Sequence, residues 1–233
     1  MPNIFIDIET IPTNDPVIID QIRESIAPPG NITKDESRLK WLEENLESEL
    51  EKAVRKTALD GLYGEILSIA WSIDNKDINV LYRKSYNDSE KELLTTFFEK
   101  INAEQYDRFE NYFPITRWIG HFISGFDLRF IWQRCVINQV TPNVSIPYRA
   151  KPWEGIVFDT KIEWSGSSQY SGASSLSKLS YVMLGEGKGD IDGSNVYDYF
   201  MKGEIEKIAE YNKTDVEMVR NLYHLMTFGN EKI

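Results

Sequence analysis

The most constraining feature of this 233-residue chain is an apolar segment near its start that carries two carboxylates. Residues 3–9 read Asn-Ile-Phe-Ile-Asp-Ile-Glu, and their β-branched and aromatic bulk predicts a strand buried on both faces. Side chains two positions apart on a strand point to the same face, so Asp7 and Glu9 should project together. Two like charges in an apolar strand are costly unless a cation neutralises them, and hard oxygen ligands suit Mg²⁺ or Mn²⁺. The alternative is a pair of solvated acids at a strand end, because Asp-x-Glu also occurs twice elsewhere in the chain.

A further acid lies within an apolar helical stripe near the other end of the chain. The residues that recur three or four positions apart in the predicted helix 204–228 are Ile208, Tyr211, Asp215, Val219, Leu222 and Met226. They share one helix face, so Asp215 lies in the middle of an apolar stripe, where a bare charge is unfavourable. Tyr211 lies one turn earlier on the same face. An aspartate bonded to neighbouring backbone or to a lysine is the alternative, which we favour less because Asp7 and Glu9 are also present.

Asp127 opens a predicted helix after the Gly-containing segment 120–126. Taken alone, an aspartate at this position is most often a helix N-cap. Together with the other acids, however, it completes a set of four carboxylates and one phenol on separate elements. That set suits two-metal hydrolysis of a phosphodiester, in which one ion lowers the pKa of a water and the other stabilises the leaving oxygen. Tyr211 would orient the attacking water.

The order of secondary-structure elements predicts an α/β fold. Segments rich in β-branched and aromatic residues predict five strands, at 3–9, 65–73, 78–83, 117–120 and 156–160. Helical spacing and capping residues predict helices at 39–54, 88–102, 126–138, 176–184 and 204–228. We therefore expect a mixed five-stranded sheet with helices on both faces, in a single domain spanning residues 1–233. Residues 13–60 interrupt this order and predict a helical insertion after the first strand.

The charge balance limits the kinds of partner. A net charge of −11 argues against tight, non-specific binding of duplex DNA, although a metal-dependent nuclease needs only a short basic surface to hold a few nucleotides. No basic segment precedes an apolar one at the N-terminus, and no apolar run is long enough to span a bilayer. We expect no membrane association and a cytoplasmic location.

The three motifs, in this order, resemble those of the DEDDy-type 3′→5′ exonucleases, which belong to the DnaQ-like, ribonuclease-H-like superfamily. The resemblance is to the predicted exonucleases related to the proofreading domain of family B DNA polymerases. It is carried by the Ile-Glu-Thr motif at 8–10, by 120–128 and by 187–216. It implies a ribonuclease-H-like sheet and a site in which Asp7, Glu9, Asp127 and Asp215 bind two divalent ions, Mg²⁺ or Mn²⁺. Tyr211 would aid the water, and nucleoside 5′-monophosphates would leave from the 3′ end.

The same resemblance implies a set of substrate-binding residues, which are Thr10, Ile11, His121, Phe122 and Phe126. The chain departs from the family at Phe122, where the family commonly has an asparagine that helps to hold the terminal nucleotide. A phenylalanine most often packs in a core, so we favour a packing role for Phe122. Stacking on a base is the alternative.

Single-stranded DNA with a free 3′ end is the substrate that we favour. An RNA exonuclease of the same mechanism is the alternative within enzymes, because nothing in the sequence reads a 2′-hydroxyl. A catalytically weak or inactive module of the same fold that binds nucleic acid or a protein is the alternative from another class, and a plain interaction domain with surface acids is a third. The presence of all four acids and the tyrosine favours the enzyme.

Overall fold

The computed structural model describes residues 2–166, 174–185 and 190–229. Its strands are β1 (Asn3–Ile11), β2 (Glu65–Ile73), β3 (Asn79–Tyr82), β4 (Arg117–Gly120) and β5 (Val157–Asp159). Its helices are α1 (Pro16–Ser25), α2 (Asp35–Lys56), α3 (Glu90–Ala103), α4 (Asp127–Ile137), α5 (Thr160–Ser165), α6 (Leu176–Leu184), α7 (Val196–Met201) and α8 (Ile205–Met226). Two single turns of 3₁₀ helix are also present, η1 (Thr57–Leu59) and η2 (Pro152–Glu154).

The five strands form one mixed sheet in the order β3-β2-β1-β4-β5, so the predicted five-stranded sheet is confirmed. β1 lies at its centre, antiparallel to β2 and parallel to β4, and the outer pairs continue each orientation. The central position agrees with the sequence of β1, whose near-continuous apolar run suits a strand that is covered on both faces.

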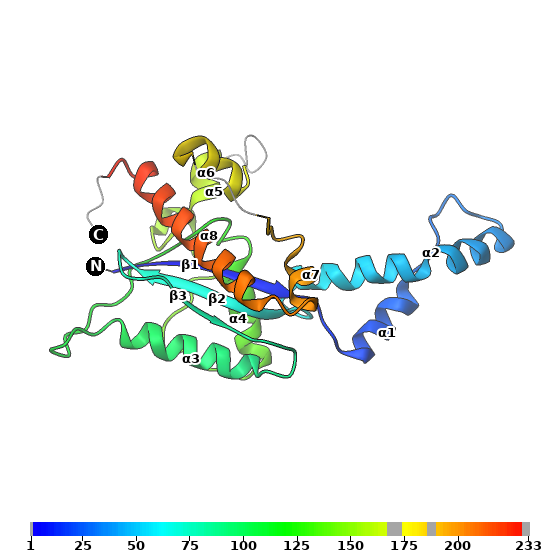
Figure 1. Ribbon diagram of the computed structural model, residues 1–233, viewed down its shortest axis with the longest axis horizontal. Coiled ribbons are helices and arrows are strands. Elements are labelled where there is room, and N and C mark those ends of the chain that lie inside the picture. Colours follow the sequence, from blue (N-terminus) through cyan, green and yellow to red (C-terminus); the bar gives the residue numbers. More distant parts are fainter. Residues whose placement is uncertain (1, 167–173, 186–189, 230–233) are drawn as a thin grey trace.

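Helices cover both faces of this sheet, as predicted (Figure 1). On one face, Ile4, Ile6 and Ile8 of β1 pack with apolar residues of α3 and α4. On the other face, Phe5 packs with α6 and α8. Alternating side chains of β1 thus supply two separate cores, and β1 is held between two packed layers.

α8 crosses the sheet on the Phe5 side. Its apolar face contributes Val216, Val219, Leu222 and Tyr223 to the core under that face, and all four are buried. Because Asp7 and Glu9 lie on the same side of β1 as Phe5, they face α8. The alternation of side chains along β1 and the apolar face of α8 thus place Asp7 and Glu9 opposite a helix from the other end of the sequence.

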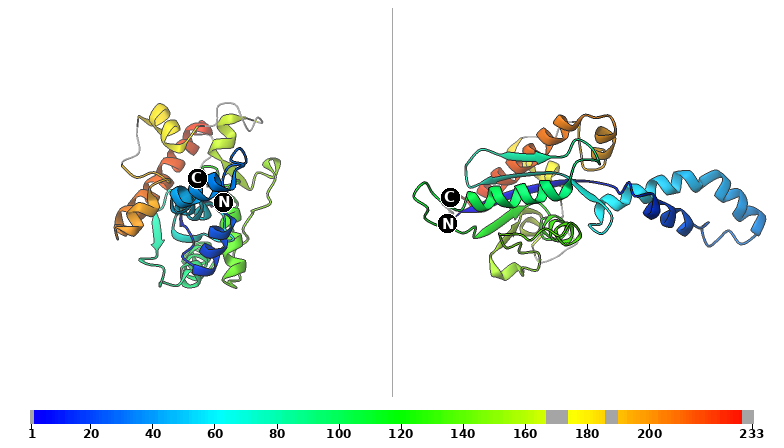
Figure 2. Two further views of the ribbon diagram at one scale, coloured as in Figure 1. Left: turned by 90° about the vertical axis from the view of Figure 1, so that its right-hand side faces the viewer. Right: turned by 90° about the horizontal axis from the view of Figure 1, so that it is seen from below.

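The insertion after the first strand is a helical arm rather than one helix. It contains α1 as well as α2, and it projects beyond the sheet in two perpendicular views (Figures 1 and 2). Neither helix has a buried residue except Leu50 of α2. We did not predict α1, although Asp15 and Pro16 are typical residues of a helix start and its isoleucines recur at helical spacing.

Other differences from the prediction are small. β1 continues through Ile11, which pairs with Glu65, beyond the predicted end of the strand. The short helices α5 and α7 were not predicted, because six residues hold too little of the helical period to reveal it. The serine-rich segment 165–177 and the glycine-rich segment 185–193, whose compositions predict loops, fall partly outside the described residues. Within the described ranges, no helix is long and apolar enough to cross a membrane.

Candidate active site

Three carboxylates meet where α8 crosses β1. One oxygen from each of Asp7, Glu9 and Asp215 lies within 4.8 Å of the other two. Glu9 and Asp215 are only 8% and 4% exposed, and Asp7 is half-buried. Three charges at this separation in a poorly solvated place repel one another strongly, unless a cation lies between them. The structure thus brings three of the predicted site residues together, and their role as metal ligands stays a prediction.

The surrounding strand leaves room for this cluster. On the α8-facing side of β2, the residues opposite Asp7 and Glu9 are Ala70 and Ser68. Small side chains there keep the space between sheet and helix open to the carboxylates. The pairing of β1 with β2 then changes register between Glu9 and Thr10, and such an irregularity re-aims the residues that follow it.

Asn212 fixes the orientation of Asp7. Its amide nitrogen donates to Asp7 Oδ2 at 2.7 Å, and its amide oxygen accepts from the Ser68 hydroxyl at 3.0 Å. Asn212 is fully buried, so both bonds form in a poorly solvated place. This role of Asn212 was not predicted from the sequence. The available signal was a polar residue beside the apolar stripe of α8, adjacent to Tyr211.

Tyr211 lies over the same cluster, as its place one turn before Asp215 predicts. Its hydroxyl is hydrogen-bonded to Asp215. Burial, followed by the charges of Glu9, Asp215 and Asp7, raises the pKa of Tyr211 far above its usual value. The phenol is therefore neutral at any physiological pH, and it can orient a water molecule but cannot act as a base.

Asp127 lies beside this group but is not part of it. It is the first residue of α4, and its Oδ1 accepts a hydrogen bond from the Ile8 amide, between the two acids of β1, at 3.2 Å. Burial, followed by the charges of Asp159 and Asp215, raises the pKa of Asp127 to about 7. Asp127 is therefore close enough to the cluster for the charge of Asp215 to affect its pKa. Its hydrogen bond with the Ile8 amide links it to the strand that carries Asp7 and Glu9.

The segment 121–126, which precedes Asp127, carries three of the predicted substrate residues. His121 Nδ1 lies 3.0 Å from the Thr160 hydroxyl. Phe122 is 43% exposed, so it does not pack in a core as favoured from the sequence. The Lys161 ammonium lies 4.0 Å from the centre of its ring. Phe126 is half-buried and packs against the core under α4.

The other two predicted substrate residues lie at the end of β1. The Thr10 hydroxyl donates to the Ala58 carbonyl at 2.7 Å, which ties β1 to the base of the arm. The Ile11 side chain is fully buried with residues of α7 and α8. Their assignment as substrate residues stays a prediction, and Ile11 can meet a ligand only through its backbone or through the shape it gives to the site.

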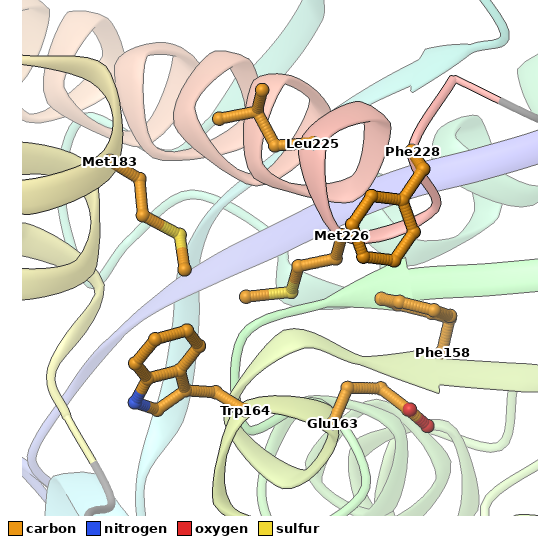
Figure 3. Close-up of a pocket in the computed structure, with 7 residues that line it drawn as sticks. All are labelled: Phe158, Glu163, Trp164, Met183, Leu225, Met226 and Phe228. Carbon is orange, nitrogen blue, oxygen red and sulfur yellow. The ribbon is translucent and has the colours of Figure 1, made fainter.

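A separate apolar cavity of about 470 Å³ lies at the far end of α8. Figure 3 shows its lining, which is Phe158, Glu163, Trp164, Met183, Leu225, Met226 and Phe228. Leu225 is ten residues from Asp215, which is about 15 Å along a helix. With one carboxylate and no convergent acids, this cavity lacks the donor set of a phosphodiesterase, and the candidate active site is the cluster at β1 and α8.

Comparison with known proteins assigns the chain to a family. Residues 62–228 match the family described as predicted 3′-5′ exonucleases related to the exonuclease domain of PolB. No protein with a curated description matches. A similar solved structure is the family B DNA polymerase of the hyperthermophilic archaeon Pyrobaculum calidifontis, with a TM-score of 0.55 and 13% identity.

That similarity covers 97% of this chain and 24% of the polymerase, so the chain spans about a quarter of its length. At this identity the likeness concerns the fold alone, and it confirms the predicted ribonuclease-H-like architecture. The family match extends over more than two thirds of the chain, including Asp127, Tyr211 and Asp215. The protein therefore belongs to the family of predicted 3′-5′ exonucleases related to the exonuclease domain of PolB.

Proposed function

We propose that the protein is a metal-dependent 3′→5′ exonuclease that removes nucleoside 5′-monophosphates from single-stranded DNA. The observation that carries this proposal is the convergence of Asp7, Glu9 and Asp215 within 4.8 Å, in a chain of a 3′-5′ exonuclease family. The resemblance of the motif order to DEDDy exonucleases supports the same activity.

The donor set fits divalent metal ions. Carboxylate oxygens are the ligands that Mg²⁺ and Mn²⁺ favour, and three of them converge from two rigid elements. The carboxylate of Asp127 accepts a hydrogen bond from the Ile8 amide, between Asp7 and Glu9. Asp127 would therefore complete the set of ligands for two ions. Two divalent ions held there would offset the charge of the acids, lower the pKa of the attacking water and stabilise the leaving oxygen.

The remaining side chains position the reacting groups. Asn212 donates to one oxygen of Asp7 and so fixes the orientation of that carboxylate beside the other acids. Tyr211 is neutral, and its hydroxyl lies on the Asp215 side of the cluster, where it would orient the attacking water. Both residues come from one turn of α8, so the rigidity of this helix fixes their spacing.

Features around the cluster favour a single strand as substrate. The Phe122 ring is 43% exposed, so its open part can contact an unpaired base, and the Lys161 ammonium that lies over the ring adds a positive charge. Bases within a duplex are already stacked. The net charge of −11 also disfavours long contacts with duplex phosphates.

Incubation with a 5′-labelled single-stranded DNA and Mn²⁺ or Mg²⁺ tests the activity. We expect a ladder that shortens from the 3′ end, and no ladder with a chelator or with the Asp7→Asn, Glu9→Gln double variant. This variant keeps the shape of both side chains while removing both charges. RNA and duplex DNA serve as parallel substrates. A wild-type protein that leaves all three substrates intact would favour a binding module instead.

The Tyr211→Phe variant tests the orienting role of the phenol. The ring should still pack in place, while the hydroxyl that orients water is missing. We expect kcat to fall by about 10- to 100-fold with KM close to that of the wild type, because the lost interaction acts on the reacting water. An unchanged kcat would show that Tyr211 only packs beside the acids.

The pH dependence of stability without metal tests the burial of Asp127 near the other acids. The folded protein raises the pKa of Asp127 to about 7, above its ordinary value of about 4, so ionisation of Asp127 opposes folding. The loss of folding free energy caused by ionised Asp127 is absent below its pKa in the unfolded chain. It is complete above its pKa in the folded protein. Relative to the Asp127→Asn variant, the metal-free wild type should therefore lose stability between about pH 4 and pH 7 in denaturant titrations. Parallel curves for the two proteins would contradict this expectation.

A further inference from the structure

The carboxylate of Asp159 joins two parts of the molecule beside the candidate active site. It ends β5, is 4% exposed and accepts hydrogen bonds from four backbone amides. Two of these amides belong to the first turn of α5, at Lys161 and Ile162, 3.1 and 3.3 Å from Oδ1. The other two belong to Phe122 and Ser124, 2.9 Å from Oδ1 and 3.0 Å from Oδ2.

Helix capping accounts for only half of these bonds. An aspartate N-cap normally satisfies amides at the start of its own helix, as Asp159 does for α5. The bonds to Phe122 and Ser124 reach across to a segment more than thirty residues earlier in the chain. A buried carboxylate that is shared between a helix and a loop fixes both in one arrangement.

The loop that Asp159 holds is strained and leads directly into α4. Phe122 has a φ of 62°, a conformation that a bulky residue keeps only when its surroundings enforce it. The Phe122 carbonyl accepts from the Phe126 amide at 3.0 Å, and the Ile123 carbonyl accepts from the Leu128 amide at 3.3 Å. These bonds flank Asp127, so a displacement of the loop would be transmitted to that side chain.

The residue after Asp159 contacts the same segment. The Thr160 hydroxyl lies 3.0 Å from His121 Nδ1 and donates to the Gly120 carbonyl at 3.3 Å. The junction of β5 and α5 therefore contacts the segment 120–124 through both of its polar side chains. The sequence analysis assigned no role to either residue.

We propose that Asp159 is a positioning residue, which clamps the segment 120–126 and thereby holds Asp127 at its place beside Ile8. This inference rests on the proposed exonuclease function for its effect on catalysis, but the clamp itself is a property of the fold. Asp159 would act on the reaction only through Asp127 and would touch neither substrate nor metal.

Two substitutions separate the clamp from the helix cap. In the Asp159→Ser variant, the hydroxyl can still cap α5 but is too short to reach both loop amides. In the Asp159→Asn variant, the oxygen can retain some of the bonds, while the amide nitrogen faces the Ser124 N–H and cannot accept from it. The Ser89→Ala variant is the matched control, because it removes an N-cap from α3 without touching this loop.

Amide hydrogen exchange measures the clamp directly. We expect faster exchange over 120–126 in the Asp159→Ser variant, with little change over α5 at 160–165. The Asp159→Asn variant should lie between this variant and the wild type. Unchanged exchange over 120–126, or equal loss of protection in the Ser89→Ala control, would overturn the clamp.

Steady-state kinetics on single-stranded DNA measure the effect on catalysis. The kcat of the Asp159→Ser variant should fall by about 10- to 100-fold, as for other small misplacements of a catalytic group, and KM should change far less. The Asp159→Asn variant should recover part of kcat, and the control should keep it. A wild-type kcat in the Asp159→Ser variant would overturn the positioning role. An inactive wild type would instead count against the proposed function, and the exchange data would still decide on the clamp.

Discussion

The carboxylates that meet at the crossing of β1 and α8 repel one another, and the packing around them must hold them together. Asp7, Glu9 and Asp215 converge within 4.8 Å in a place where water can screen them only in part. A chain can keep such an arrangement only if the elements that carry the acids are held firmly from elsewhere. The two cores on either side of the sheet meet this requirement, because they fix β1 between α8 on one face and α3 and α4 on the other.

The polar contacts around the acids make the arrangement specific. Asn212 orients Asp7, the Ile8 amide binds Asp127, and Asp159 holds the loop that precedes Asp127. Each contact involves a group that is mostly shielded from water, where a hydrogen bond fixes geometry more strongly than it does at the surface. These contacts give the site one arrangement of donors, which is the condition for the proposed catalysis by preorganised charges.

The acids could be predicted from the sequence because each breaks a periodic apolar pattern. Asp7 and Glu9 interrupt a buried strand, and Asp215 interrupts the stripe of α8, so burial of the charges followed from the pattern itself. Asp159 interrupts no such pattern, and the position of Asn212 beside the stripe of α8 did not identify its partners. Their partners are distant in the chain, and an isolated asparagine or aspartate has many commoner roles in helices and turns.

The exposure of Phe122 was missed for a related reason. A phenylalanine beside apolar neighbours suggests a core, but its left-handed backbone turns the ring toward the surface against Lys161.

The claim that the clustered acids bind two metal ions is tested by titrating the metal-free protein with Mn²⁺. Binding is followed by calorimetry or by the spin resonance of free Mn²⁺. We expect two bound ions per chain and marked loss of binding in the Asp215→Asn variant. Equal binding by both proteins, or none by the wild type, would contradict it.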